Sequence, residues 1–317
     1  MKLIVQIPCL NEEKNLADVI KEIPRQISGI DTVEVLVVSD GSTDKTVQIA
    51  KQAGADHVID RKFLRGLAQT FKEGLDFCLA HGADIIVNTD GDNHYNQARM
   101  GELVRPIVDG LADVVIAGRE VDKLERMPFA NKYGNKAGSY VVTRLAGIPG
   151  MDVSTGYRAY TREAAMRINI LSHHTYTHET FFQLADLKLR IVEVPIKARP
   201  VKRKSRLIKS LSSHIKKSMT VILRMTLLYK PLTVFLTIGL IFFFIGVAFG
   251  VRFLYFYLTG DGGGHIQSVI LAAVLMILGV QILVMGLIAS AVGWNRRIIE
   301  EALFQVKKIR YREKNNK

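Results

Sequence analysis

Two long apolar stretches in the last third of the sequence limit the folds that this chain can adopt. No charged residue occurs from Leu232 to Val251 or from Ile266 to Trp294. Each stretch reaches the length of about 20 residues that an α-helix needs to cross a bilayer. Each is also apolar on every side, whereas a surface helix of a soluble domain keeps a polar face. The sequence therefore predicts two transmembrane helices, at about residues 231–257 and 266–294.

Basic residues flank the two apolar stretches. Residues 188–230 carry thirteen Lys and Arg against one acid, residues 295–317 carry eight against three, and the loop Thr259–His265 contains no Lys or Arg. Because cytoplasmic loops carry an excess of Lys and Arg, both flanks and both termini are expected in the cytoplasm. The sequence thus predicts a multi-pass protein of the cell membrane. The alternative, two buried core helices, would leave both stretches without a polar face for water.

The formal net charge of the chain is +13, a value that could indicate nucleic-acid binding. The two basic flanks account for all of this charge, and residues 1–187 carry a net charge of −4. The flanks are expected to contact anionic lipid headgroups, where each Lys or Arg is worth about 1 kcal/mol. No nucleic-acid partner is predicted.

These patterns divide the chain into four parts. Residues 1–200 are expected to form a cytoplasmic α/β domain, and residues 201–230 a basic juxtamembrane helix with apolar residues at helical spacing. Residues 231–294 form the transmembrane hairpin, and residues 295–317 a second basic cytoplasmic helix. The first of these basic helices could lie in the membrane interface, dock on the globular domain, or do both. The second could pack beside the first or bridge to a neighbouring subunit of a homo-oligomer.

Within the first part, the apolar run Ile85–Val87 predicts a buried strand that is followed by two carboxylates, Asp90 and Asp92. Ligands of open α/β sheets bind at the carboxyl ends of the strands. Two carboxylates on a turn suit Mg²⁺ or Mn²⁺, which take their remaining ligands from water and from substrate phosphates. Taken alone, the pair does not indicate a metal site, because carboxylates are common in solvated turns that cap the next helix.

Other apolar runs complete a sheet with helices between its strands. Leu3–Ile7 and Val33–Ser39 predict two further strands that end beside Asn11 and Asp40. Asn11 is expected to cap the first helix, and Ser42 or Thr43 the helix over 46–53. Further strands are predicted at 113–117 and 191–197, and helices at 67–80, 100–109 and 129–145. Cys9 and Cys78 are expected to be reduced thiols.

The chain resembles the glycosyltransferases of family 2, in the branch that transfers a sugar to a polyprenyl phosphate such as dolichyl or undecaprenyl phosphate. Five ordered blocks carry this resemblance: Ile7–Glu13, Val38–Asp44, Asn88–Asn93, Ser154–Ala159 and Ile191–Arg199. They spread over residues 1 to about 207. The resemblance implies a GT-A fold, which is Rossmann-like with a mostly parallel sheet.

The resemblance also implies a binding site for a nucleotide-diphosphate sugar. The residues that it assigns to this donor are Pro8, Asn11, Glu13, Asp40, Arg65 and Asp90. Asp90 and Asp92 would hold Mg²⁺ or Mn²⁺, and Asp92 would be catalytic. His94 stands where relatives often carry a ligating Gln. It is therefore either a third ligand or a hydrogen-bonding partner of the diphosphate or the turn.

A second set of residues is expected to hold the phosphate of the acceptor. This set comprises Arg119, Arg199, Lys202, Ser205 and Arg206, and Arg199 is also counted as catalytic. Relatives have a Gly-containing loop followed by Ser-Lys-Leu, whereas this chain lacks the Gly and has Arg206 in place of the Lys. For most of these cations, contact with solvent or lipid is an equally good interpretation. Glu179 matches a family acid that could orient a cation in the acceptor site or hydrogen-bond the donor sugar, or it is a favourable acid in the first turn of a helix.

The expected reaction transfers the sugar of a UDP- or GDP-sugar to polyprenyl phosphate with inversion at the anomeric carbon. The attacking phosphate oxygen is already anionic, so no strong general base is required. A processive polysaccharide synthase is one alternative, but the Gln-x-x-Arg-Trp block of such enzymes is absent, and the only Trp is Trp294. A catalytically silent membrane scaffold is another, and the presence of Asp40, Asp90 and Asp92 argues against it.

Overall fold

The structure is a computed structural model and describes most of the chain. The described residues are 1–119, 143, 147–148, 150–171, 176–196, 198–199, 220, 223–224, 226–260 and 262–313. They fall into two compact units, one of residues 1–222 with 301–317 and one of residues 223–300. Three acceptor-site candidates, Lys202, Ser205 and Arg206, lie outside the described residues. So do nearly all of the predicted helix 129–145 and most of the basic segment 201–230.

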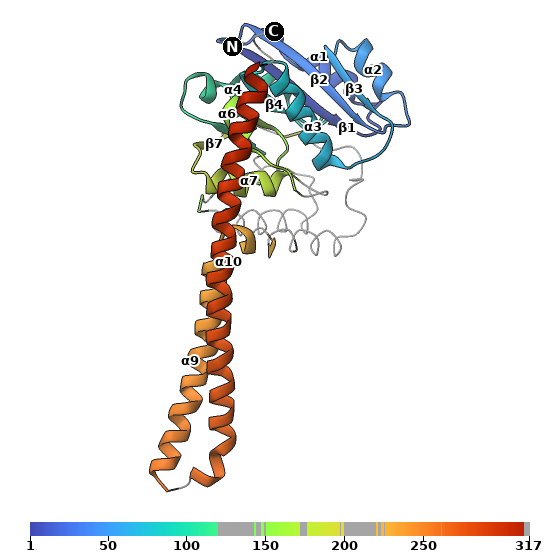
Figure 1. The fold of residues 1–317 in the computed structure, drawn as a ribbon. Coiled ribbons are helices and arrows are strands. Elements are labelled where there is room, and N and C mark those ends of the chain that lie inside the picture. Colours follow the sequence, from blue (N-terminus) through green and yellow to red (C-terminus); the bar gives the residue numbers. More distant parts are fainter. Residues whose placement is uncertain are drawn as a thin grey trace. The chain divides into compact units, whose positions relative to one another are not determined.

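The first unit is built on a seven-stranded sheet with the strand order β3-β2-β1-β4-β6-β5-β7 (Figure 1). The strands are β1 (Lys2–Cys9), β2 (Thr32–Asp40), β3 (His57–Arg61), β4 (Ile85–Asn88), β5 (Val114–Gly118), β6 (Arg158–Thr161) and β7 (Ile191–Pro195). All neighbouring strands are parallel except β6, which is antiparallel to both β4 and β5. The predicted mostly parallel α/β sheet is confirmed.

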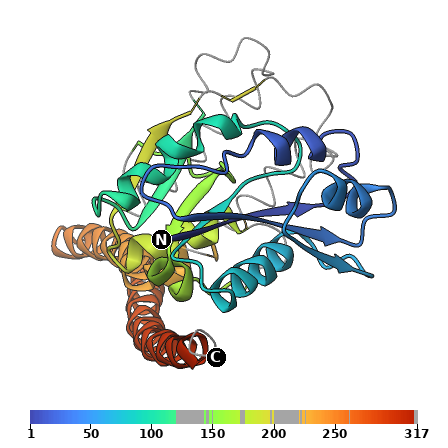
Figure 2. The ribbon, with the colours of Figure 1, turned by 90° about the horizontal axis from the view of Figure 1, so that it is seen from above.

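Helices cover both faces of this sheet (Figure 2). They are α1 (Leu16–Glu22), α2 (Thr46–Gln52), α3 (Leu67–Ala80), α4 (Met100–Val108), α6 (Arg162–Arg167) and α7 (Thr177–Asp186). Alternate residues of the central strands, such as Leu3 and Val5, pack with apolar residues of α1, α2 and α4 in one core. The opposite face of β1 and β2 meets α3, where Gly74 lies against Gln6. Burial on both faces explains why these strands are nearly continuous apolar runs.

The five predicted strands and the helices at 46–53, 67–80 and 100–109 are present, with ends that differ by a few residues at most. The predicted helix caps are wrong. Asn11 has a φ of 55° and accepts a hydrogen bond from the backbone N–H of Thr43 at 2.8 Å. Helix α1 begins five residues later, and Asp44 rather than Ser42 or Thr43 accepts from the N–H of Thr46 in the first turn of α2. The turns after β1 and β2 lie side by side and bond to each other.

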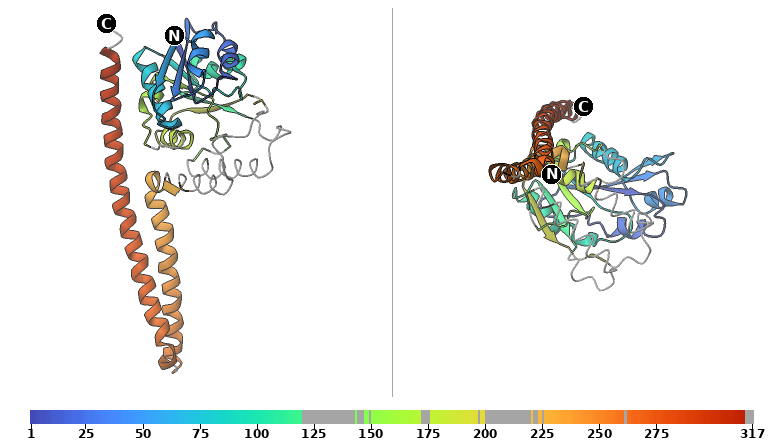
Figure 3. Two further views of the ribbon diagram at one scale, coloured as in Figure 1. Left: turned by 90° about the vertical axis from the view of Figure 1, so that its right-hand side faces the viewer. Right: turned by 90° about the horizontal axis from the view of Figure 1, so that it is seen from below.

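The second unit is an apolar helical hairpin (Figure 3). Helix α9 (Pro231–Leu258) and helix α10 (Ile266–Glu313) are both long and apolar enough to cross a membrane. Glycines bring their backbones together: a Cβ on Gly279 would lie 2.8 Å from the carbonyl oxygen of Gly239. Small residues of this kind permit close packing of helices in lipid. The predicted hairpin is therefore present, and its crossing of a bilayer stays a prediction.

The last turns of α10 belong to the first unit. The Tyr311 hydroxyl donates to Oδ1 of Asp76 on α3 at 3.1 Å, and Lys307 Nζ donates to the carbonyl oxygens of Met166 and Ile168 at 3.0 and 2.8 Å. The side chains of Tyr311 and Phe304 are buried there. Residues 295–317 were expected to form a separate basic helix, whereas α10 continues through Trp294 to Glu313 without a break. A homo-oligomer stays a prediction.

Candidate functional site at the carboxyl edge of the sheet

The ends of β1, β2 and β4 converge at one edge of the sheet, as their sequences predict. The backbone N–H of Glu12, after β1, donates to Oγ1 of Thr46, after β2, at 2.8 Å. Gly91, after β4, packs so closely that a Cβ there would lie 2.7 Å from Sγ of Cys9. Only a glycine fits at this contact. Three loops with polar side chains therefore share one surface.

Asp40 is the best-satisfied carboxylate of the predicted donor site. It is buried and accepts hydrogen bonds from the backbone N–H groups of Arg65 and Gly66, both at 2.8 Å. Arg61 Nη1 lies 3.3 Å from the same carboxylate. Asp40 thus fixes the loop before α3 at the edge of the sheet, and the side chain of Arg65 is exposed. The contact of Asp40 and Arg65 with a nucleotide stays a prediction.

The other predicted donor residues line the turns beside Asp40. Pro8 is paired with Val38 in the ladder between β1 and β2. The carboxylate of Glu13 accepts from the backbone N–H of Lys45 at 3.2 Å. These contacts bring Pro8, Asn11, Glu13 and Asp40 together, in agreement with the proximity that the sequence blocks imply. They do not by themselves assign a ligand.

Asp90 and Asp92 lie together in the turn after β4. Burial, followed by the nearby charge of Asp92, raises the pKa of Asp90 to about 7. Gly156 packs on this carboxylate, since a Cβ at Gly156 would lie 2.9 Å from Oδ1 of Asp90. Oδ1 of Asp92 accepts from the backbone N–H of His94 at 3.2 Å. Two close carboxylates with one pKa raised in this way are favourable surroundings for a cation.

The two carboxylates fit a divalent cation that takes its other ligands from a substrate. Among the described residues, no three His, Cys, Asp or Glu side chains form a group that could hold a metal alone. Mg²⁺ is usually bound in proteins by one or two carboxylates together with water and phosphate oxygens. Nδ1 of His94 is buried and has no hydrogen-bond partner in the described part of the chain, and burial lowers the pKa of His94, which favours the neutral ring. A neutral ring is required of a ligand, and His94 remains a hypothesis as the third one.

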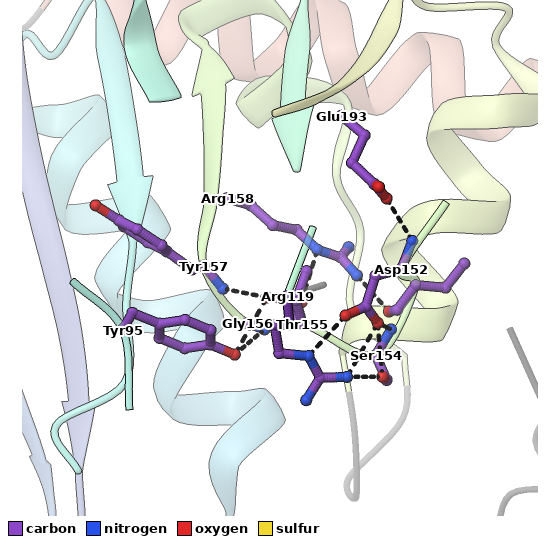
Figure 4. Close-up of polar contacts among 10 residues, drawn as sticks. Tyr95, Arg119, Asp152, Ser154, Thr155, Gly156, Tyr157, Arg158 and Glu193 are labelled. Carbon is purple, nitrogen blue, oxygen red and sulfur yellow. Dashed lines mark hydrogen bonds and ion pairs between the residues drawn. The ribbon is translucent and has the colours of Figure 1, made fainter. Parts of the chain in front are cut away.

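Arg119 follows β5 and is held by a buried carboxylate (Figure 4). Its Nε donates to Oδ2 of Asp152 at 2.6 Å, and its Nη2 donates to Oδ1 at 3.0 Å and to the Ser154 hydroxyl. Burial alone would lower the pKa of Arg119, but Tyr95, Asp152 and Asp90 raise it above its ordinary value. Burial likewise opposes the charge of Asp152, and Arg119 keeps the pKa of this carboxyl below its usual range. Both side chains are therefore charged.

Arg199 is held in a similar way by Glu22, the last residue of α1. Its Nη1 lies 2.8 Å from one oxygen of Glu22, and Nη2 contacts the other. The same Nη1 donates to Oδ1 of Asn93 at 2.5 Å, and the Arg199 backbone N–H donates to the carbonyl of His94 at 2.8 Å. Arg199 therefore joins α1 to the turn that carries Asp92. Its predicted contact with an acceptor phosphate is not tested by these contacts.

Buried polar residues support the turn that packs on Asp90. Arg158 is fully buried and donates to the carbonyl oxygens of Val153, Thr155 and Thr177 and to the hydroxyl of Thr180. The Tyr95 hydroxyl accepts from the Gly156 N–H at 3.1 Å. Glu179 is also buried and accepts from the Leu171 N–H at 2.9 Å, a contact that ties a loop to the first turn of α7.

Sequence reasoning missed several residues of this site. Asp152 and Glu22, which hold the two arginines, lie outside the five sequence blocks and have no signal of their own. Tyr95 and Arg158 could have been found from the sequence, because Tyr95 follows the candidate ligand His94 and Arg158 lies in the block Ser154–Ala159.

Comparisons with known proteins agree with this arrangement. The model of the family described as Glycosyl transferase family 2 matches residues 4–168. The dolichyl-phosphate hexose transferase of Haloferax volcanii is 32% identical over 194 residues, which cover 61% of this chain and 81% of the relative. The undecaprenyl-phosphate mannosyltransferase of Micrococcus luteus is 29% identical over 206 residues, which cover 62% and 83%.

The fold also resembles solved structures. Glucosyl-3-phosphoglycerate synthase from Mycobacterium tuberculosis, in complex with Mn²⁺, UDP-glucose and phosphoglyceric acid, matches with a TM-score of 0.58 and 20% sequence identity. The match covers 71% of this chain and 79% of that protein. At this identity the likeness concerns the fold, and it supports a GT-A architecture for the first unit.

Proposed function

This chain is a member of glycosyl transferase family 2, and we propose that it transfers a sugar from a nucleotide-diphosphate sugar to a polyprenyl phosphate. The observation that carries the proposal is the pair of carboxylates, Asp90 and Asp92, flanked by two arginines at the carboxyl edge of the sheet. The names of the relatives support a polyprenyl phosphate as the acceptor. The apolar hairpin supports a membrane location, where such a lipid resides.

The chemistry needs charge stabilisation and positioning more than proton transfer. Asp90 and Asp92 would hold Mg²⁺ or Mn²⁺, which when bound would neutralise the departing diphosphate. Asp40 fixes the loop that would border the nucleoside, and Arg119 and Arg199 would offset the repulsion between the two phosphorylated substrates. The acceptor phosphate is an anionic nucleophile at neutral pH, so the site needs no strong general base.

The proposal is tested by supplying purified protein with a panel of UDP- and GDP-sugars, polyprenyl phosphate, and Mg²⁺ or Mn²⁺. We expect one donor to yield a labelled product that extracts into organic solvent and is sensitive to mild acid. A water-soluble polymer would indicate a polysaccharide synthase instead. Donor binding without any transfer across the whole panel would indicate a scaffold.

The proposal includes a topology in which both termini lie in the cytoplasm and the loop between α9 and α10 lies outside. The basic flanks support this orientation. A cysteine at the exposed Gly263 should then react with an impermeant thiol reagent added to intact cells, and one at the exposed Lys308 should not. Background labelling should be low because Cys9 and Cys78 are buried. The reverse labelling pattern would contradict the orientation and the cytoplasmic active site.

A further inference from the structure

Among the residues that the structure describes, none contacts one edge of the Arg119 guanidinium. An arginine carries five N–H donors in a rigid planar fork. Three of those of Arg119 are used, by both oxygens of Asp152 and by the Ser154 hydroxyl. Among the described residues, no acceptor contacts Nη1, which carries the other two donors, and Figure 4 shows it pointing away from Asp152. The charge of Arg119 acts on Asp90, so the guanidinium as a whole lies near the carboxylate pair.

The carboxylate that holds Arg119 is itself held rigidly. Asp152 Oδ1 accepts from the Ser154 backbone N–H at 3.2 Å and from the Ser154 hydroxyl at 2.9 Å. The backbone N–H of Asp152 donates to Oε2 of Glu193 on β7 at 2.5 Å. Gly118 leaves room for this Glu193 side chain, since a Cβ there would lie 2.5 Å from Oε1. These contacts with Ser154 and Glu193 fix the position of Asp152, and the fixed carboxylate in turn orients the guanidinium of Arg119.

We propose that Asp152 is a positioning residue that presents Nη1 of Arg119 to the phosphate of the lipid acceptor. The proposal rests on the proposed function and adds a residue to it. The ion pair of Arg119 and Asp152 has no net charge as a whole, but Arg119 keeps the two N–H donors of Nη1. Arg119 then recognises the acceptor through directed hydrogen bonds, which are strong when they reach a phosphate oxygen, rather than through excess positive charge.

These two roles of Asp152 predict opposite effects of one substitution on the binding of the acceptor. Asp152→Asn keeps the size of the side chain but makes the site more positive by one charge. If Asp152 only tempers the local charge, the variant should bind an anionic acceptor more tightly. If Asp152 orients Arg119, the variant should raise KM for polyprenyl phosphate on the order of tenfold. The apparent KM for the donor sugar should stay within about twofold, and it serves as the internal comparison.

A matched control lies at the opposite end of strand β5 from Arg119. Asp113, just before β5, also forms a two-pronged pair with an arginine, since Oδ1 and Oδ2 accept from Arg190 at 2.8 and 3.1 Å. This pair lies at the amino end of β5, whereas Arg119 follows its carboxyl end. Asp113→Asn should leave both KM values unchanged. Ser154→Ala should raise only the acceptor KM, by a few fold, because it removes a contact of Asp152 and of Arg119 without changing a charge.

Acceptor kinetics of the full-length protein in detergent decide the proposal. An unchanged or lowered acceptor KM in Asp152→Asn would overturn it, and so would a rise confined to the donor KM. If Asp152→Asn does not fold, as judged by thermal unfolding, the same criteria apply to Ser154→Ala. If the wild type transfers no sugar, the proposed function fails separately. Binding of farnesyl phosphate by wild type and variants would then still decide the role of Asp152, with weaker binding expected in Asp152→Asn.

Discussion

Asp92→Asn should lower the rate of sugar transfer by about 10²-fold or more, because loss of charge stabilisation at a developing leaving group typically costs this much. The variant should remain folded. Asp92 accepts one hydrogen bond from the His94 N–H, and an asparagine oxygen can accept the same bond. Transfer into organic-extractable lipid, measured with saturating Mg²⁺ or Mn²⁺, tests the expectation.

A suitable control for this experiment is Asp109→Asn. Asp109 follows α4 and forms an exposed ion pair with Arg105 at 2.8 Å, so the substitution removes the same kind of group from the surface. Exposed pairs of this kind contribute about 0–1 kcal/mol to stability. Transfer by Asp109→Asn should match the wild type. Wild-type turnover by Asp92→Asn would remove this residue from the proposed metal site.

Arg199→Lys should also impair transfer strongly, on the order of tenfold or more, although it keeps the positive charge. A lysine ammonium cannot bridge two oxygens of one carboxylate in the planar geometry of a guanidinium. Arg199 makes this contact with Glu22 and also bonds to Asn93, and both contacts would be lost or weakened. If Arg199 serves the acceptor, kcat/KM for polyprenyl phosphate should fall while equilibrium binding of the donor sugar changes little.

The structure supplies a second variant that tests this division of roles. Glu22→Gln leaves the hydrogen bond between Arg199 and Asn93 in place. It weakens only the ion pair that holds the guanidinium of Arg199. If Arg199 instead supports the turn of Asp92, Arg199→Lys should weaken donor binding and leave the acceptor dependence unchanged. Arg190→Lys, at the surface pair with Asp113, is the control and should have no effect on transfer.

The sequence was sufficient for those parts of the fold that depend on local pattern. The strands β1, β2 and β4 are nearly continuous apolar runs because both of their faces are covered, and such runs are recognisable without any knowledge of their neighbours. Helix α3 was located to the residue, since its amphipathic pattern has clear ends. Strand β3 was missed because it lies at an edge of the sheet, where its residues are only partly buried.

The parts that could not be predicted depend on contacts between distant residues. Glu22 and Arg199 are 177 residues apart, and Asp76 and Tyr311 are 235 apart. No local property of Glu22 distinguishes it from any other acid at the end of a helix. The prediction that Asn11 caps the first helix was wrong for the same reason, because its side chain accepts a hydrogen bond from Thr43 on another turn. Proximity of the site residues was predictable from strand order, but their pairing was not.

The chain order of the first unit has a consequence for biosynthesis. Domains generally fold from the N-terminus as they leave the ribosome. Residues 1–222 are made first, but Phe304 and Tyr311, which are buried in the same unit, follow the whole apolar hairpin. Until they emerge, their partners on α3 and α6 remain uncovered. The catalytic unit therefore completes its packing only after the apolar hairpin has been synthesised, so that maturation of the enzyme waits for nearly the whole chain.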